Sequence, residues 1–145
     1  PTKKLRDQVL EMFLPSRKKT GELSISVTSF GFKYGVPAEA DLVFDVRFLP
    51  NPYYVAALRN QTGNDEAVSS YVLNSDVADD FLQKLEDLLK FLLPKYQEEG
   101  KEVLVIAIGC TGGHHRSVAI SNEICKRLST PEMPVSLTHR DIGKP

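Results

Sequence analysis

The stretch that decides the fold reads VLVIAIGCTGGHHRSV and covers residues 103–118 of the 145-residue chain. Its first six residues are all apolar, and four of them are β-branched. A strand with one exposed face would alternate with polar residues, so this run predicts a strand that is buried on both faces. Glycines at 109, 112 and 113 then allow a tight turn, and the apolar spacing that follows predicts a helix beginning at Arg116 or Ser117.

A strand, a glycine-rich turn and a helix N-terminus, in this order, form a cradle for an anion. Unpaired backbone amides point into such a turn, and the helix dipole adds a partial positive charge there. The guanidinium of Arg116 would strengthen the attraction. The sequence therefore predicts a phosphate site with these candidate residues: Cys110, Thr111, Gly112, Gly113, His114, His115, Arg116 and Ser117.

Three interpretations of this loop fit the residues. In the first, the loop holds a phosphate group without breaking it. In the second, Cys110 and Arg116, which have five residues between them and a hydroxyl after them, form the loop of a cysteine-dependent phosphatase. Gly109 stands where such phosphatases usually have a histidine, and no Asp is evident as the leaving-group acid, which disfavours catalysis. In the third, the loop is only a structural turn between a strand and a helix.

The composition limits the classes of partner. The formal net charge is -1 and the isoelectric point is near 6.4, so there is no overall attraction to nucleic acid or to an anionic membrane. No run of about 18 apolar residues and no signal peptide is visible. Cys110 and Cys125 differ in setting and do not indicate a disulfide framework. We therefore expect one domain in a reducing cytoplasm, with no membrane partner, no metal and no cofactor.

The rest of the sequence alternates between strand and helix patterns. Strand patterns cover residues 23–27 and 42–47, and a last strand is expected at 135–138. Helical spacing covers residues 2–14 and, most clearly, 76–97. The apolar stripe of the longer helix is expected in the core: Phe81, Leu85, Leu88, Leu89 and Leu92. This alternation predicts the α/β class, as a single layered domain with a mostly parallel sheet flanked by helices and a ligand crevice at the carboxyl ends of the strands.

Four other places carry side chains that suit a phosphorylated ligand. Asp45 and Arg47 share one face at a strand end, and Lys33 lies between two glycines after another strand. The full set of candidates in chain order is Lys33, Asp45 and Arg47, Thr62 and Gly63, and the possible RNA contacts His139, Arg140 and Lys144. The structural alternatives are that Asp45 and Arg47 pair with other charges in a buried polar patch, that Thr62 and Gly63 form a plain turn, and that the last group belongs to a solvated tail. The aromatics Phe30 and Phe32 either stack on bases or wedge their loop against the core.

Three long motifs stand along the chain as SFGFKYG at 29–35, DVRFLPNP at 45–52 and GCTGGHHRSV at 109–118. In this order they resemble the C-terminal domain of the RapZ/YvcJ family of bacterial proteins. The resemblance covers nearly the whole chain. His114 stands where some members have Lys, and Tyr53 stands where some have His.

The resemblance implies a fold similar to a phosphofructokinase subdomain. It also implies a regulatory domain, not an enzyme, that senses the phosphorylated amino sugar glucosamine-6-phosphate in the control of amino-sugar and cell-envelope metabolism. Residues 21–145 would be this domain, and residues 1–20 a helix or connector from a nucleotide-binding domain that hydrolyses ATP or GTP. Small RNA, a ribonuclease and further copies of the protein are the implied partners. A cysteine-dependent phosphatase and a pure small-RNA adaptor remain the alternatives.

Overall fold

The structure of the chain is a computed structural model that describes residues 22–145. The helix expected at 2–14 lies outside the described residues, and so does the whole connector expected at 1–20. Within the described part, four strands form one sheet in the order β2-β3-β1-β4, and every neighbouring pair is parallel. The strands are β1 (Ser24–Gly31), β2 (Leu42–Asp45), β3 (Val103–Cys110) and β4 (Val135–His139). The predicted α/β class with a parallel sheet is confirmed, while the likeness to a phosphofructokinase subdomain stays a prediction.

The two central strands bring two of the sequence motifs to the same level. β1 and β3 pair along their whole length, from Ser24 opposite Val103 to Gly31 opposite Cys110. The carboxyl ends of both strands therefore lie at one edge of the sheet, which is where parallel α/β folds place their ligands. The strand predicted at residue 103 is a central strand, but it is buried on both faces only toward its carboxyl end, because Val103 at its start is 52% exposed.

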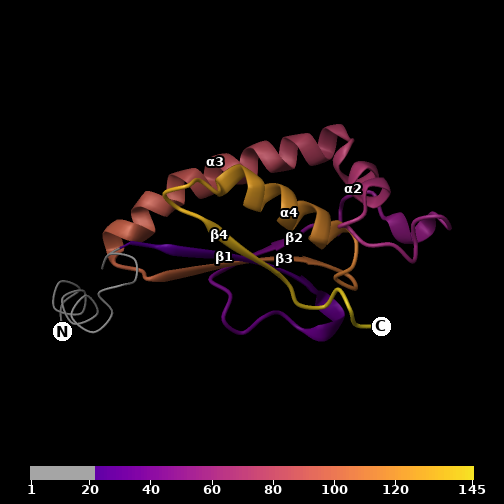
Figure 1. Cartoon of the computed structure of the whole chain (residues 1–145), viewed down its shortest axis with the longest axis horizontal. Helices are drawn as coiled ribbons and strands as arrows, with labels where there is room; N and C mark the ends of the chain where they lie inside the picture. Colours follow the sequence, from indigo (N-terminus) through magenta and orange to yellow (C-terminus); the bar gives the residue numbers. More distant parts are fainter. Residues whose placement is uncertain (1–21) are drawn as a thin grey trace.

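The three α-helices of residues 22–145 cover the same face of the sheet (Figure 1). They are α2 (Glu66–Leu73), α3 (Asp76–Glu99) and α4 (Arg116–Leu128). The link from β1 to β2 instead runs along the other face, and it contains the 3-10 turn η1 (Phe32–Tyr34). A second 3-10 turn, η2 (Pro52–Tyr54), follows β2. Helix α4 begins at Arg116, as predicted, whereas α2 was not anticipated because only Val68 and Val72 of its eight residues are buried.

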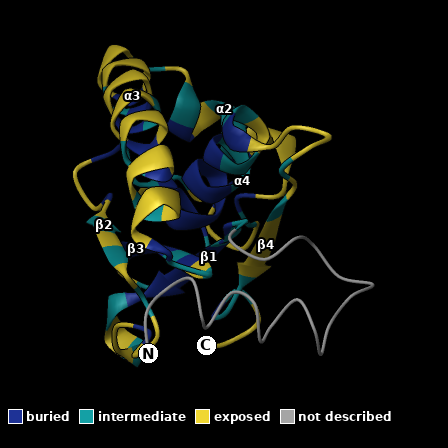
Figure 2. Cartoon of the chain, turned by 90° about the vertical axis from the view of Figure 1, so that its left-hand side faces the viewer, coloured by how far each residue is buried: buried dark blue, intermediate teal, exposed yellow. Residues whose placement is uncertain are grey.

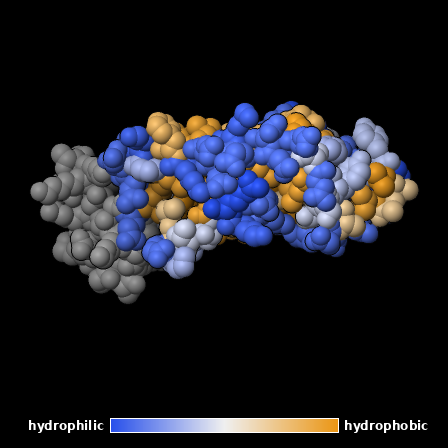
Figure 3. Space-filling model, turned by 90° about the horizontal axis from the view of Figure 1, so that it is seen from above, coloured by the Kyte–Doolittle hydropathy of each residue, from blue (hydrophilic) through white to orange (hydrophobic). Residues whose placement is uncertain are grey.

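The core lies between the sheet and the helical layer (Figure 2). Alternate residues of β1 and β3, among them Val27, Ile106 and Ile108, point into it and are fully buried. Helix α4 contributes Ile120 and Ile124 to the same cluster. Seen from the helical side, the surface carries a hydrophilic band with smaller hydrophobic areas beside it (Figure 3). None of the helices between residues 22 and 145 is long and apolar enough to cross a bilayer.

Helix α3 presents a different stripe to the core from the predicted one. The buried residues are Ala78, Leu82, Leu85, Leu89 and Leu93. Leu85 and Leu89 were predicted correctly, but Leu88 is 44% exposed. The helix is so rich in leucine that two stripes of helical spacing overlap on it, and the choice between them depends on which one meets the sheet. Ser75 caps the helix by accepting a hydrogen bond from the Ala78 amide, and Gly100 ends it in the left-handed conformation.

Glycines let the strand ends approach one another closely. A Cβ atom on Gly31 would lie 2.5 Å from the backbone carbon of Gly112, and one on Gly109 would lie 2.4 Å from the Phe30 ring. Phe30 is fully buried and packs edge-on against Phe32, with ring centroids 4.8 Å apart. Phe30 therefore wedges its loop against the sheet and is not available to stack on a base. The same crowding explains why the position before Cys110 is glycine.

Candidate functional site

A cavity of about 310 Å³ opens at the carboxyl ends of β1 and β3, next to the loop that joins β3 to α4. Four separate parts of the chain line it. The lining residues are Lys33, Asn51, Tyr53, Tyr54, Cys110, Thr111, Gly112, His114, His115, Arg116 and Pro145. Six of the eight loop residues predicted from the sequence thus lie on the cavity wall, together with Lys33. The other two, Gly113 and Ser117, support the wall from behind.

The loop is held in shape from several sides. Gly113 has a φ of 79°, a conformation that favours glycine, and its neighbour on β1 is Gly31. The amide of Gly63 donates a hydrogen bond of 2.9 Å to the carbonyl of His114. At the end of β3, the buried thiol of Cys110 lies 3.1 Å from the Ser117 hydroxyl and donates to it. The backbone of the cradle is therefore fixed before any ligand arrives.

Arg116 is the more buried of the two cations on the cavity wall. The residue is only 5% exposed, and its Nη1 donates to the carbonyls of Arg47 and Leu49. Its Nη2 lies 3.4 Å from the Thr111 hydroxyl. No ion pair among residues 22–145 involves Arg116, although its charge helps to lower the pKa of Asp45. Two carbonyls thus orient the guanidinium, and no carboxylate contacts it directly.

The two histidines of the loop have different partners. The Nε2 atom of His114 lies 2.6 Å from the carbonyl of Lys144, and the Nε2 atom of His115 lies 3.0 Å from the carbonyl of Arg59. A carbonyl can only accept, so both Nε2 atoms carry the proton. Burial is the main cause that lowers the pKa of His115, and it outweighs the hydrogen bond to the Arg59 carbonyl. His115 is therefore neutral at physiological pH and contributes no fixed charge to the cavity.

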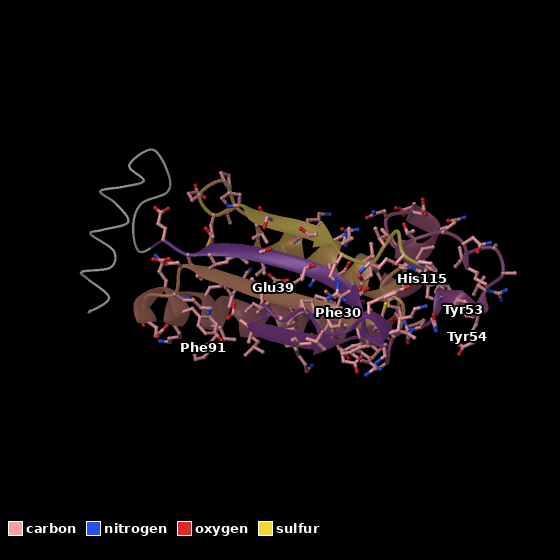
Figure 4. All side chains as sticks on the ribbon, turned by 90° about the horizontal axis from the view of Figure 1, so that it is seen from below. Phe30, Glu39, Tyr53, Tyr54, Phe91 and His115 are labelled. Atoms are coloured by element: carbon pink, nitrogen blue, oxygen red, sulfur yellow. The ribbon has the colours of Figure 1, made fainter. Side chains whose placement is uncertain are left out.

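Three residues from the turn after β2 complete the cavity, and sequence reasoning did not select them. Asn51 caps η2 by accepting a hydrogen bond from the Tyr53 amide, and this turn presents Tyr53 and Tyr54 side by side. Figure 4 shows both tyrosines at the same end of the molecule as His115, whereas Phe91 lies toward the opposite end. Tyr54 is 79% exposed. The sequence signal that pointed to this turn was the family motif at 45–52, which runs directly into Tyr53, where some members have His.

Asp45 and Arg47 do not line the cavity. Arg47 donates to both carboxylate oxygens of Asp45, with an Nη2 to Oδ2 distance of 2.7 Å, and its guanidinium lies over the Phe32 ring. The hydrogen bonds from Arg47 lower the pKa of Asp45. The structural alternative was a buried patch in which these residues pair with other charges, but they pair with each other and their side chains are 48% and 46% exposed. The Arg47 backbone carbonyl, not its side chain, serves the site through Arg116.

Thr62 and Gly63 also lie outside the cavity lining. Asp65 accepts a hydrogen bond from the Thr62 amide at 2.8 Å, which closes a polar turn. A Cβ atom on Gly63 would lie 2.5 Å from the His115 carbonyl. These residues support the start of α4 by close packing.

The three possible RNA contacts are each engaged within the protein. His139 Nδ1 lies 2.7 Å from the buried Ser29 hydroxyl, and burial lowers the pKa of His139. Arg140 and Lys144 both form ion pairs with Asp141, at 2.8 and 2.7 Å. Their role toward RNA remains a prediction.

The cavity as a whole suits an anion. Lys33 and Arg116 supply charge, His114 lies beside them, and no Asp or Glu is among the residues that line it. Within residues 22–145 there is no group of three or more His, Cys, Asp or Glu side chains arranged to hold a metal ion. The cavity wall itself offers hydrogen bonding, positive charge and the thiol of Cys110 as a candidate nucleophile.

Comparisons with known proteins agree with the motifs. A family model described as the RapZ C-terminal domain matches residues 23–143. A nucleotide-binding protein of Caldanaerobacter subterraneus is 55% identical over 97% of this chain and 49% of its own length. Nucleotide-binding proteins of Caldicellulosiruptor bescii and Clostridium botulinum are 54% and 50% identical, over 98% and 99% of this chain and 48% and 49% of theirs. The chain thus spans about half the length of the curated relatives it matches.

Proposed function

This chain belongs to the family of RapZ C-terminal domains, as its three motifs predicted, and we propose that it is a receptor domain for a phosphorylated sugar. The observation that carries the proposal is the buried guanidinium of Arg116, which faces the cavity and has no carboxylate partner. A buried charge is costly unless a counter-charge or hydrogen bonds compensate it. A phosphate group in the cavity would provide that compensation and would accept hydrogen bonds from the loop amides.

The cavity volume supports a small ligand. A volume of about 310 Å³ is at the lower end of the range for small-molecule sites, which suits a single sugar ring with one phosphate. The tyrosines of η2 offer aromatic rings and hydroxyls to the part of the ligand beyond the phosphate. Glucosamine-6-phosphate is the ligand that the family resemblance suggests.

The amino group of that ligand has no obvious acidic partner. The Asp45 carboxylate, which the sequence offered for this purpose, is held by Arg47. The geometry therefore supports recognition of the phosphate and of a hydroxylated ring, and preference for an amino sugar must come from neutral acceptors. Glucose-6-phosphate is accordingly the informative competitor.

The remainder of the natural protein is part of the proposal as well. Because the relatives are called nucleotide-binding proteins and are about twice as long, we place nucleotide binding, and the ATP or GTP hydrolysis expected of it, in a preceding domain. The domain described here would report sugar phosphate levels to that domain and to an RNA or ribonuclease partner in the cytoplasm.

Titration calorimetry with glucosamine-6-phosphate tests the proposal. Charge-assisted hydrogen bonds contribute roughly 1.5 to 3 kcal/mol each, so we expect Arg116→Ala to weaken binding at least about tenfold. Arg116→Lys keeps the charge but not the planar fork, and we expect it to recover only part of the loss. Arg127→Ala, at the far end of the same helix, is the matched control and should bind normally. Unchanged affinity in folded Arg116→Ala would contradict the proposal.

The phosphatase alternative also has a test, because the Cys110 thiol and the Ser117 hydroxyl that it requires are in contact. The cavity places a thiol, a hydroxyl and Arg116 together, but no acid is on its wall to protonate a leaving group. We therefore expect no turnover of a chromogenic phosphomonoester. Hydrolysis by the parent protein that Cys110→Ser abolishes would establish catalysis instead.

A further inference from the structure

We propose that residues 140–145 form a displaceable gate, because their backbone oxygens accept hydrogen bonds from His114 and Lys33, which a ligand in the cavity would use. We call this segment the C-terminal strap. In Figure 1 the chain ends beside the loop that joins β3 to α4, at the same end of the sheet as η1. The inference rests on the proposed function, because it concerns how an anion reaches the same cavity.

A buried carboxylate fixes the base of the strap. The side chain of Asp141 is fully buried, and its Oδ2 accepts a hydrogen bond of 2.8 Å from the Gly31 amide at the end of β1. Arg140 donates to both carboxylate oxygens and also to the carbonyl of Gly35. The base is thus tied to β1 and to the loop after it, so it stays in place when the tip moves.

The tip of the strap is held more weakly. The Lys144 amide donates to the Asp141 carbonyl at 3.0 Å and closes a turn. The Lys144 ammonium pairs with Asp141 and lies 5.0 Å from the centre of the Tyr34 ring, yet its side chain is 45% exposed. Solvent competes with such contacts, so the tip can detach while Asp141 keeps its other partners.

The tip competes with an anion for specific N–H groups. His114 Nε2 has a single proton, and the carbonyl of Lys144 accepts it at 2.6 Å. Lys33 Nζ donates to the carbonyl of Pro145 at 3.2 Å, and Pro145 is itself on the cavity wall. Lys33 has three protons and can serve two acceptors, but His114 Nε2 cannot. A phosphate oxygen that binds His114 must therefore displace the Lys144 carbonyl.

A phosphate group is expected to displace the Lys144 carbonyl because it forms the stronger hydrogen bond with His114. The Lys144 carbonyl that His114 binds is a neutral acceptor, whereas a phosphate group is charged, and hydrogen bonds to charged acceptors are roughly twice as strong. Each ligand nevertheless forfeits the energy of the strap contacts when it binds. Removal of the tip should therefore strengthen anion binding, although it removes the positive charge of Lys144 from the mouth of the cavity.

Calorimetry on the 145-residue chain tests whether removal of the tip strengthens anion binding. Glucosamine-6-phosphate and inorganic phosphate are the probes. A variant that lacks residues 143–145 is expected to bind both about fivefold more tightly, as loss of a competing hydrogen bond implies. Lys144→Ala keeps the carbonyl but loosens the turn, and a smaller gain in the same direction is expected. Lys126→Ala removes an equal charge at the far end of α4 and should not change affinity. Melting temperatures establish that each variant is folded.

The outcomes separate the gate from the proposed function. Tighter binding in the deletion variant, or in Lys144→Ala if the deletion variant does not fold, supports the gate. Unchanged or weaker binding overturns it, because the strap would then be a bystander or a ligand contact, while the receptor function would stand. If the parent and the deletion variant both fail to bind either probe, the proposed function falls and the gate falls with it.

Discussion

Asp141 shows at the scale of one residue how this fold uses a buried charge. Burial by itself raises the pKa of the Asp141 carboxyl, but hydrogen bonds from Arg140, the Gly31 amide and Lys144 outweigh burial and lower that pKa to about 2. The folded state therefore binds a proton more weakly than the unfolded state, in which the value is 3.8. Stability from this group is present above about pH 4 and is lost as the pH falls toward 2.

We predict that Asp141→Asn loses about 2 kcal/mol of unfolding free energy at pH 7, the equivalent of the gap between 3.8 and about 2. The variant should also lose less stability than the parent between pH 5 and pH 2, because it lacks the group that titrates there. Urea denaturation at several pH values measures both effects. Asp80→Asn, at an exposed position of α3, is the control. If both variants had the same unfolding free energy, the ion pairs of Asp141 would not contribute to stability.

The sequence predicted which residues line the cavity where those residues lie close together along the chain. The loop from Cys110 to Arg116 forms the cavity wall because a strand, three glycines and a helix start leave few other arrangements. The tyrosines of η2 were not selected, since they reach the cavity only through the position of η2 next to the loop. The pairing of Asp45 with Arg47 was an open alternative because two residues on one strand face can contact each other as well as a ligand.

At the scale of elements, the periodicity of α3 determines where the helix runs, whereas packing determines which face of it is buried. Its leucine spacing predicted a helix over almost the observed range. The buried face was assigned only in part, because Leu88 and Leu89 both continue a helical stripe and only Leu89 is buried. Only contact with the sheet and with α4 decides between them.

Two adjacent substitutions on α3 test that assignment. We predict that Leu89→Ala lowers the unfolding free energy by about 2 to 5 kcal/mol, since Leu89 is fully buried and its removal leaves a cavity. Leu88→Ala should cost less than about 1 kcal/mol because Leu88 is already 44% exposed and lies outside the core cluster. Chemical denaturation measures the unfolding free energy of both variants. The comparison is matched because both carry the same Leu→Ala change on the same helix. Equal costs would mean that the helix is rotated relative to the face described here.

At the scale of the whole molecule, the site exists because the sheet is parallel. Carboxyl ends of β1 and β3 lie level, so the segment at Lys33 and the loop at Cys110 meet although about half of the chain separates them. The turn at η2 and the C-terminal strap join them from two further parts of the sequence. The sequence predicted the edge at which ligands collect, but not the strand order β2-β3-β1-β4, because period-two patterns do not specify neighbours.

A ligand that binds at this edge should therefore change backbone protection in several distant segments at once. We predict that glucosamine-6-phosphate slows amide hydrogen exchange in residues 111–116 and 53–54, whose backbones border the cavity, and speeds it at residues 143–144 as the strap detaches. Residues 84–99 of α3 lie outside the cavity lining and should not respond. Glucosamine without phosphate is the control, since it lacks the group that Arg116 requires. Protection confined to the loop, with η2 and the strap unaffected, would mean that the four segments do not act as one site.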